Sequence, residues 1–189
     1  MKLLLMFMLF GIAAGIYATE NLVLADFGEN LIAEPGWEWQ GFSDRVMGGR
    51  SDIEHVRLIG TPEGTALQLS GRVVTRGGGF IQVRLLHEQG NFDASSYAGI
   101  EVEVLAPAGG SYYLFARTRD NRLPWSYYGA QLEVPETRSV LRIPWSAFLG
   151  QATLRNSIRP QMLSSIALVA AYDDFFADLH IFRVSLYHQ

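Results

Sequence analysis

Residues 37–51 read Trp-Glu-Trp-Gln-Gly-Phe-Ser-Asp-Arg-Val-Met-Gly-Gly-Arg-Ser, and the interpretation of the whole chain starts from this stretch. Two tryptophans, a phenylalanine and a methionine lie close to an Asp-Arg pair and a double glycine. Neither an amphipathic helix nor a regularly alternating strand matches this mixture. We therefore expect an ordered loop that closes one end of a β-sandwich, with its apolar side chains buried. The alternative is a binding surface carried on a rigid loop.

The turn inside this stretch contains residues with defined conformational roles. Gly48 and Gly49 can adopt backbone conformations closed to other residues, so they mark a tight turn or a close approach of two backbones. Asp44 can accept hydrogen bonds from turn amides, and Ser51 can do the same more weakly. The apolar plug beneath the turn is expected to consist of Trp37, Trp39, Phe42 and Met47.

The composition limits the classes of protein that the chain can belong to. Its 189 residues are 49% apolar and 18% charged, which is typical of one domain with a well-filled core. The net charge is −4 and no basic block occurs, so a nucleic-acid partner held by phosphate contacts is not expected. Cysteine is absent, which excludes disulfides, thiolate metal sites and cysteine nucleophiles.

The first 18 residues have the pattern of a secretory signal peptide. Lys2 precedes an apolar run that ends at Ala18, and a polar segment begins at Thr19. We expect cleavage after Ala18 and a periplasmic or secreted protein made of one domain, residues 19–189. The alternative is a retained N-terminal anchor that holds the domain at the membrane, although the run is slightly short for a span.

The mature chain contains short runs typical of β-strands, separated by turn residues. Alternating or β-rich segments occur at residues 66–75, 80–85, 100–104, 111–119, 140–143 and 179–186. Residues 166–171 are apolar on both faces, as expected for a central strand. Single helical turns are expected at 145–149 and 159–163. The pattern predicts an all-β protein, a β-sandwich or jelly roll.

The stretch 44–51, Asp-Arg-Val-Met-Gly-Gly-Arg-Ser, preceded by tryptophan, resembles the signature of the complex I intermediate-associated protein 30 family. The signature residues are Trp37, Trp39, Asp44, Arg45, Val46, Met47, Gly48, Gly49 and Ser51. Further segments resemble the family in order along the chain: 69–73, 78–80 with Arg84, 97–102, 112–118, 141–148 and 182–184. The resemblance covers roughly Leu24 to Tyr187.

This resemblance implies a single jelly-roll sandwich of the galactose-binding-like type. The best understood relatives assist assembly of respiratory complex I, and the resemblance supplies no catalytic residue. It therefore implies a non-enzymatic, chaperone-like assembly factor that binds a protein partner. A secretory leader would send such a protein away from the compartment where a complex I intermediate matures.

A second set of candidates lies on the predicted polar face of the strands. Gln82 and Arg84 share one face, and Arg117 and Arg119 share another with Tyr113 and Phe115. Aromatic rings stack on sugar faces and arginine supplies planar donors, so this face is a candidate for binding a glycan or a small ligand. The candidate residues are Arg84, Arg117, Arg119, Trp125, Tyr127, Tyr128 and Gln131. A structural alternative pairs Arg84 and Arg117 with Glu101 or Glu103 across neighbouring strands.

The remaining polar residues form no recognisable catalytic or metal-binding motif. The four histidines, His55, His87, His180 and His188, lack metal-ligand spacing. The cluster Asp173, Asp174 and Asp178 matches no defined cation loop, so it is interpreted as a solvated loop. We expect no enzyme, no cofactor and no metal. The first hypothesis is a module that binds a protein partner, and the alternative is a glycan- or small-ligand-binding domain of the cell envelope.

Overall fold

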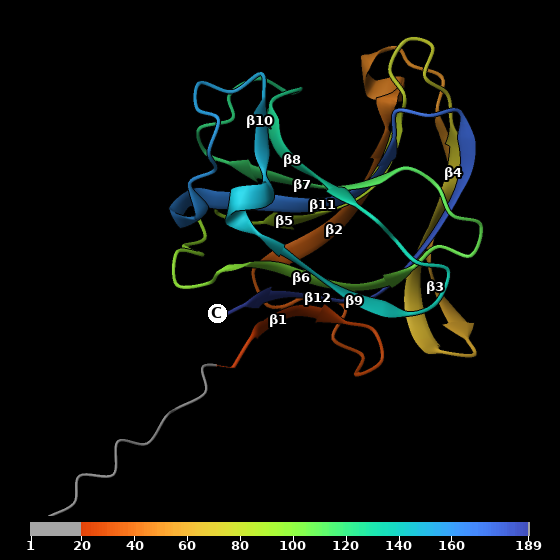
Figure 1. The fold of residues 1–189 in the computed structure, drawn as a ribbon, viewed down its shortest axis with the longest axis horizontal. Helices are drawn as coiled ribbons and strands as arrows, with labels where there is room; N and C mark the ends of the chain where they lie inside the picture. Colours follow the sequence, from red (N-terminus) through yellow and green to blue (C-terminus); the bar gives the residue numbers. More distant parts are fainter. Residues whose placement is uncertain (1–19, 189) are drawn as a thin grey trace, which may run out of the picture.

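The computed structural model describes residues 20–188 and consists of two antiparallel β-sheets packed face to face (Figure 1). The helical elements of this range are the 3-10 turns η1 (Asp44–Met47), η2 (Trp145–Ala147) and η3 (Pro160–Met162). No helix within the described residues is long and apolar enough to cross a membrane. The predicted leader, residues 1–18, lies outside the described part of the chain. The prediction of an all-β sandwich is confirmed.

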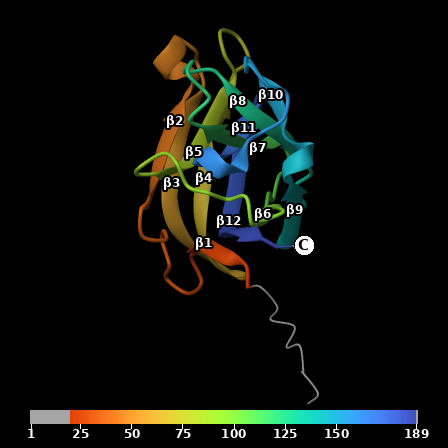
Figure 2. The same ribbon diagram turned by 90° about the vertical axis from the view of Figure 1, so that its left-hand side faces the viewer.

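Sheet A contains six strands in the spatial order β3-β4-β12-β6-β9, with β1 paired to a further part of β12. Its strands are β1 (Leu22–Asp26), β3 (Asp52–Thr61), β4 (Gly64–Val73), β6 (Gly99–Leu105), β9 (Ser139–Pro144) and β12 (Phe175–Tyr187). The last strand of the chain thus lies at the centre of this sheet and pairs with the first one (Figures 1 and 2).

Sheet B also contains six strands, in the order β10-β8-β7-β11-β5-β2. Its strands are β2 (Trp37–Ser43), β5 (Phe80–His87), β7 (Tyr112–Thr118), β8 (Tyr127–Leu132), β10 (Leu149–Gln151) and β11 (Leu163–Ala171). The apolar run at 166–171 is part of β11, which lies between β5 and β7 as a central strand should. This order brings β2, β5 and β7 into one sheet although they are far apart in sequence.

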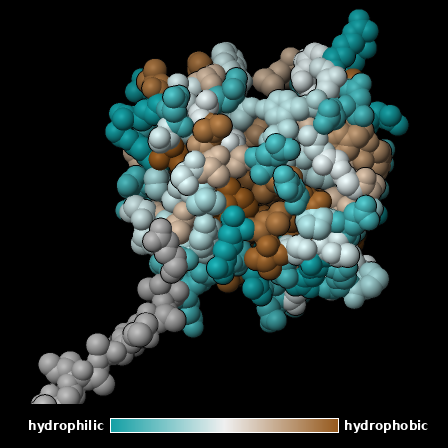
Figure 3. Space-filling view, viewed as in Figure 1, coloured by the Kyte–Doolittle hydropathy of each residue, from teal (hydrophilic) through white to brown (hydrophobic). Residues whose placement is uncertain are grey.

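The core fills the space between the inner faces of the two sheets. Every second residue of β5, including Ile81, Val83 and Leu85, is buried there together with Leu69 and Leu179 of sheet A. Burying a side chain of this size contributes about 1.5–3 kcal/mol relative to leaving it in water. On the face seen in Figure 3, apolar residues gather near the centre of the molecule and polar residues surround them. The alternation of β5 therefore leaves its other residues on the outer face of sheet B.

The prediction that residues 37–51 form one ordered loop is wrong for its first half. Residues Trp37–Ser43 are β2, an edge strand of sheet B paired with β5. Trp37 and Trp39 face the core, while Phe42 lies opposite Gln82 on the other face. The alternation was hidden because Gly41 occupies an inward position, where Val56 lies so close that a side chain has little room.

The remaining expectations have a mixed outcome. Both predicted helical turns are present as η2 and η3, whereas β1, β3, β8 and β10 were not predicted. The proposed pairing of Arg84 and Arg117 with glutamates is wrong, because β5 and β7 lie in sheet B and β6 lies in sheet A. The glutamates of β6 pair with other arginines, Glu101 with Arg142 at 2.7 Å and Glu103 with Arg138 at 2.8 Å.

Candidate functional site

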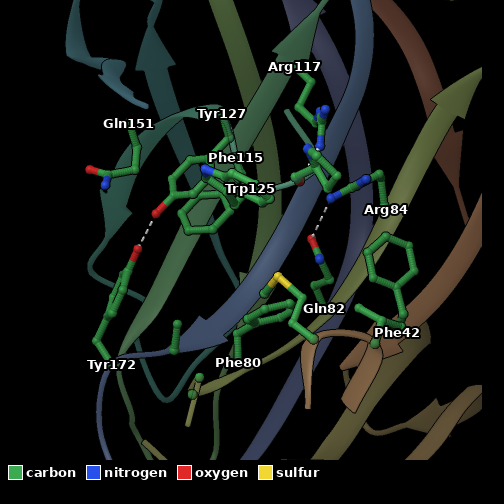
Figure 4. Close-up of a pocket in the computed structure, with 16 residues that line it drawn as sticks. Phe42, Phe80, Gln82, Arg84, Phe115, Arg117, Trp125, Tyr127, Gln151 and Tyr172 are labelled. Atoms are coloured by element: carbon green, nitrogen blue, oxygen red, sulfur yellow. Dashed lines mark hydrogen bonds between the residues drawn. The ribbon is translucent and has the colours of Figure 1, made fainter. Parts of the chain in front are cut away.

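The outer face of sheet B carries a cavity of about 530 Å³ (Figure 4). All six strands of the sheet contribute to its lining, and its rim is formed by η1 at residues 46–47 and by loops at residues 78–79 and 124–125. The lining residues are Phe42, Val46, Met47, Gly78, Gly79, Phe80, Gln82, Arg84, Phe115, Arg117, Pro124, Trp125, Tyr127, Gln151, Ala171 and Tyr172.

The cavity exists because the central strand of sheet B carries small residues on its outer face. Ala167, Val169 and Ala171 of β11 form a low floor, and they are buried although they face away from the core. Phe80 of β5 and Phe115 of β7 pack against this floor from the two sides. Large rings that flank small side chains leave a hollow between them, and the hollow runs along β11.

One wall of the cavity is a set of packed aromatic rings. Phe115 and Tyr127 are stacked with centroids 3.9 Å apart at an angle of 15°, and Tyr172 meets Tyr113 edge-on at 4.9 Å. The hydroxyls of Tyr127 and Tyr172 are hydrogen-bonded to each other. Burial, and next this hydrogen bond, raise the pKa of Tyr127 above its usual range. Tyr127 is thus a neutral hydrogen-bonding group at the edge of a flat aromatic surface.

The stacked arrangement depends on a glycine and on one unusual backbone conformation. Gly129 of β8 lies opposite Phe115, and a side chain at Gly129 would come within 3.2 Å of that ring. Tyr172 has a φ of 71°, which is rare for a residue other than glycine and costs about 1–3 kcal/mol. Its amide donates to the carbonyl of Gly79 at 3.1 Å, which fixes Tyr172 beside the cavity.

The opposite end of the cavity is cationic. Figure 4 shows the guanidinium groups of Arg84 and Arg117 at the same end, away from Tyr172. Arg84 lies over the ring of Phe42, with its Cζ 4.5 Å from the ring centroid. Burial, and next the charge of Arg117, lower the pKa of Arg84 to about 10. Burial also lowers the pKa of Arg117. Arginine remains protonated in proteins, so both groups keep their positive charge at neutral pH.

The two arginines differ in how their donors are used. Arg117 donates to the backbone carbonyls of Asn121, Leu123 and Pro124 at 3.1, 3.0 and 2.7 Å, so it holds the loop that ends in Trp125. Arg84 has one long bond, from Nη2 to Oε1 of Gln82 at 3.4 Å. The Nε of Arg84 is buried without a hydrogen-bond partner among the described residues. Arg84 is thus the arginine with donors to spare.

The other rim of the cavity is organised by Asp44. This side chain is fully buried and accepts bonds from the amide of Ser51 (2.9 Å), the hydroxyl of Ser51 (2.8 Å) and the amide of Gly79 (2.5 Å). Ser51 also accepts from the amide of Val74 at 3.0 Å. Asp44 therefore joins η1 to the 74–79 loop, which places Val46 and Met47 over the cavity.

The glycines around Asp44 have two different reasons to be glycine. Gly48 has a φ of 84°, a conformation that side chains disfavour, yet no atom lies within 4 Å of its missing Cβ. A Cβ at Gly49 would lie 2.1 Å from Cγ of Asp44, and one at Gly78 would lie 2.6 Å from Oδ2 of Asp44. Gly49 and Gly78 therefore allow two backbone segments to close around the carboxylate.

Comparison with known proteins agrees with this architecture. The model of the complex I intermediate-associated protein 30 family matches residues 29–175. The chain belongs to the complex I intermediate-associated protein 30 family. Among curated protein sequences, none matches this chain significantly.

Solved structures of carbohydrate-binding modules have a similar fold. A family 11 module from Clostridium thermocellum, in complex with a β-1,3-1,4-mixed-linked tetrasaccharide, gives a TM-score of 0.64 at 13% identity, over 89% of this chain and 95% of that one. The family 11 module of the cellulase Lic26A-Cel5E from the same organism gives 0.66 at 13% identity, over 91% and 96%. The family 30 module of the Clostridium thermocellum cellulase Cel9D-Cel44B has a TM-score of 0.53 at 12% identity, over 89% of this chain and 91% of that one. At these identities the likeness shows the fold alone.

The structure brings together four of the seven predicted binding residues of this family member. Arg84, Arg117, Trp125 and Tyr127 line the cavity. Tyr128 is 1% exposed and belongs to the core, because neighbouring residues of a strand point to opposite faces. The other two, Arg119 and Gln131, are exposed and do not line the cavity.

The signature residues of this family member fall into four groups. Val46 and Met47 line the cavity, and Asp44, Gly48, Gly49 and Ser51 build the turn that supports them. Trp37 and Trp39 pack in or against the core, and Arg45 forms an exposed ion pair with Asp52 at 3.1 Å.

Several lining residues were outside the predicted candidate set. Phe42, Phe80 and Gln82 lie on the outer face of their strands. For Phe80 and Gln82, the alternation of residues 80–85 in the sequence already indicated that they share a face with Arg84. Tyr172 and Gln151 lie at strand ends, and no local pattern in the sequence indicates where they point.

The polar clusters considered for metal binding have other partners. Asp174 accepts from the amide and hydroxyl of Thr75 at 2.6 and 2.7 Å, and Asp178 bonds to Gln68 and His180. Within residues 20–188, no group of three or more potential metal ligands is found. His87 packs against Trp37.

Proposed function

We propose that this protein is a non-catalytic binding module that takes a ring-containing unit of a glycan, or a small ligand of that size, in the cavity of sheet B. The observation that carries this proposal is the aromatic-walled cavity itself. Its volume of about 530 Å³ lies in the range of ligand sites, and its walls offer flat faces with a few polar groups at the edge. Sugar rings stack on such faces, and their hydroxyls match the tyrosine, glutamine and arginine donors.

The chemistry of the lining supports binding without catalysis. A general acid or base needs a pKa near the working pH. Arg84 and Arg117 stay charged, and the pKa of Tyr127 is raised further from neutrality. Among the described residues, the lining includes no histidine, aspartate, glutamate or lysine.

A protein partner is the second candidate, and exposed apolar side chains at the rim favour it. Val46 is 72% exposed and Trp125 is 55% exposed, and Met47 and Leu123 lie near them in the same two rim loops. Exposed apolar clusters mark interaction sites. The family is named for its association with complex I intermediates, so an assembly partner is the form this candidate takes.

We also propose that the domain works outside the cytoplasm, after cleavage of the leader at Ala18. The apolar run that follows Lys2 supports this proposal. Sequencing the N-terminus of the protein purified from its native host tests it. An N-terminus at Thr19 is expected, and a retained Met1 would favour the membrane-anchored alternative.

The test of the binding function compares one substitution at the cavity with one control substitution elsewhere. Trp125→Ala removes a ring at the cavity, and Phe176→Ala removes an exposed ring from β12 of sheet A. We expect Trp125→Ala to weaken glycan binding about tenfold in calorimetry, since a stacked ring contributes on the order of 1 kcal/mol or more. Phe176→Ala should bind as the parent does. Equal binding by the parent and Trp125→Ala would contradict the proposal.

Co-purification from the native host separates the two candidates. A protein partner that is lost with Val46→Asp but is unaffected by saturating glycan would favour the second candidate. Loss of any retained protein upon addition of a glycan ligand would place both interactions at one site.

A further inference from the structure

The charges in the cavity are of one sign. Arg84 and Arg117 both line it, and no carboxylate of the described chain does. Neither arginine forms an ion pair within residues 20–188, and the chain as a whole carries a net charge of −4. The cavity is therefore a local positive site on an acidic protein, which attracts anions over several ångströms.

Three arginines elsewhere in the structure form ion pairs within the chain. Arg138, Arg142 and Arg183 each contact a carboxylate at 2.7–2.8 Å, although all three are partly in water. Arg84 lines the cavity, forms no ion pair within residues 20–188, and its side chain has one hydrogen bond there, from Nη2 to Gln82, of 3.4 Å. A largely desolvated cation without a counter-charge is unfavourable for folding. The position of Arg84 in the cavity wall therefore points to a counter-charge that a ligand supplies.

The geometry around Arg84 selects the kind of anion. The Nη groups of Arg117 donate to three loop carbonyls, whereas those of Arg84 form only the long bond to Gln82, so the Nη groups of Arg84 are the ones left for a ligand. A planar guanidinium matches the two oxygens of a carboxylate. Figure 4 shows Phe80, Phe115 and Trp125 between this end and the tyrosine end, and these rings offer a flat apolar surface. A ligand that fits has a carboxylate attached to a ring with one apolar face.

Resting on the proposed function, we infer that the cavity recognises an acidic glycan, with the carboxylate of a uronate unit bound by Arg84 and its sugar ring packed against Phe80 and Phe115. Gln82, beside Arg84, and Gln151, at the far end, supply neutral donors and acceptors for the hydroxyls. The hydrogen-bonded pair of Tyr127 and Tyr172 limits the opposite end of the cavity.

A calorimetric titration with matched ligands tests the inference. The ligands are tetrasaccharides of galacturonate, glucuronate, mannuronate and guluronate, each with its methyl ester, which has nearly the same shape and no charge. A hexaglutamate peptide and inorganic phosphate serve as anions without a sugar ring. The proteins are the full chain, Arg84→Met, Arg84→Lys and, as a matched control on sheet A, Arg72→Met.

We expect at least one uronate to bind and its methyl ester to bind 10- to 100-fold more weakly, the range for about 1.5–3 kcal/mol from a charge-assisted hydrogen bond. Arg84→Met should lose the same factor, Arg84→Lys part of it, and Arg72→Met none. Raising the salt concentration from 50 to 500 mM should weaken uronate binding more than ester binding.

The contradicting outcomes separate the inference from the proposed function. Equal binding of acid and ester, still lost in Trp125→Ala, would overturn the acidic specificity and leave the glycan site in place. Tighter binding of hexaglutamate or phosphate than of any uronate would overturn the sugar part of the inference. Failure of both series to bind would overturn the inference, and if neutral tetrasaccharides also fail to bind it would overturn the proposed glycan function.

Discussion

Asp44 lies beneath the rim of the cavity and Arg84 lies in its wall, and the surroundings of these two groups are opposite. Asp44 accepts three short hydrogen bonds from Ser51 and Gly79, and glycines on both sides let the backbone close around it. The side chain of Arg84 has one hydrogen bond of 3.4 Å within residues 20–188 and a like-charged neighbour, Arg117. A satisfied buried charge builds the fold, whereas an unsatisfied one is available for a ligand.

The strongest test of this contrast is the replacement Asp44→Ala. Three buried donors lose their acceptor, and each unpaired group costs about 1–3 kcal/mol, so we expect a loss of about 4 kcal/mol in the free energy of unfolding. Urea denaturation measures it. A loss below about 1 kcal/mol would show that Asp44 does not organise the rim.

The glycines beside Asp44 sharpen the same point. Gly49→Ala places a Cβ against the Asp44 carboxyl, and overpacking of this kind costs about 3 kcal/mol at the upper end of its range. Gly48→Ala meets no atom but keeps a positive φ, which costs about 1 kcal/mol. Thermal melting should therefore rank the parent above Gly48→Ala and Gly48→Ala above Gly49→Ala. The reverse order would contradict the packing argument.

Arg117 is the intermediate case, since its donors are used on the loop that carries Trp125. Replacing it with methionine frees three carbonyls, of which most are near solvent, and we expect a loss of about 2 kcal/mol. The same variant should lose ligand affinity because Trp125 is no longer fixed. Hydrogen exchange of residues 121–125 distinguishes this effect from a loss of charge alone, since only release of the loop raises their exchange rates.

Arg84→Met should have the smallest effect on the free protein, and of the opposite sign. Removing a buried cation that has no counter-charge is expected to raise the free energy of unfolding by about 0.5–1 kcal/mol. Arg84→Met would then raise the free energy of unfolding, whereas Asp44→Ala would lower it. Destabilisation of Arg84→Met by more than about 1 kcal/mol would mean that Arg84 is structural.

The pH dependence of that difference follows from the direction of the shift. The pKa of Arg84 is lowered from its ordinary value to about 10 in the folded state, first by burial. The folded state therefore binds the proton more weakly than the unfolded state, and the cost of this charge to stability is full below pH 10 and decreases as the pH rises above 10. The stability gap between Arg84→Met and the parent should be constant from pH 6 to 9 and become smaller above pH 10. Denaturation series for both proteins measure it.

Local alternation in the sequence was enough to predict part of the cavity. It placed Gln82 with Arg84 and Phe115 with Arg117, because side chains of a strand alternate strictly between two faces. It did not show that β5 and β7 flank the same strand, since pairing depends on residues as far apart as Arg84 and Ala167. The all-β fold was predictable because many short runs shared the same signal.

Other parts of the site could not be predicted for physical reasons. The face of β8 that meets the core decides that Tyr127 lines the cavity and Tyr128 is buried. The sequence does not show which face this is, because Gly129 weakens the alternation there. Tyr172 points to the cavity because of a left-handed backbone conformation stabilised by Gly79. Asp44 and the double glycine were recognised as a turn, but the 78–79 segment that closes on them lies some 30 residues further along.

The most direct measurement of the central claim is urea denaturation of the parent and Arg84→Met at pH 7, with and without the best-binding uronate tetrasaccharide. The account predicts that the free variant is at least as stable as the parent. It also predicts that a ligand at 100 times its Kd stabilises the parent by about 2.7 kcal/mol and the variant by much less. A variant that is less stable when free, or that gains as much from the ligand, would contradict the assignment of Arg84 to an acidic ligand.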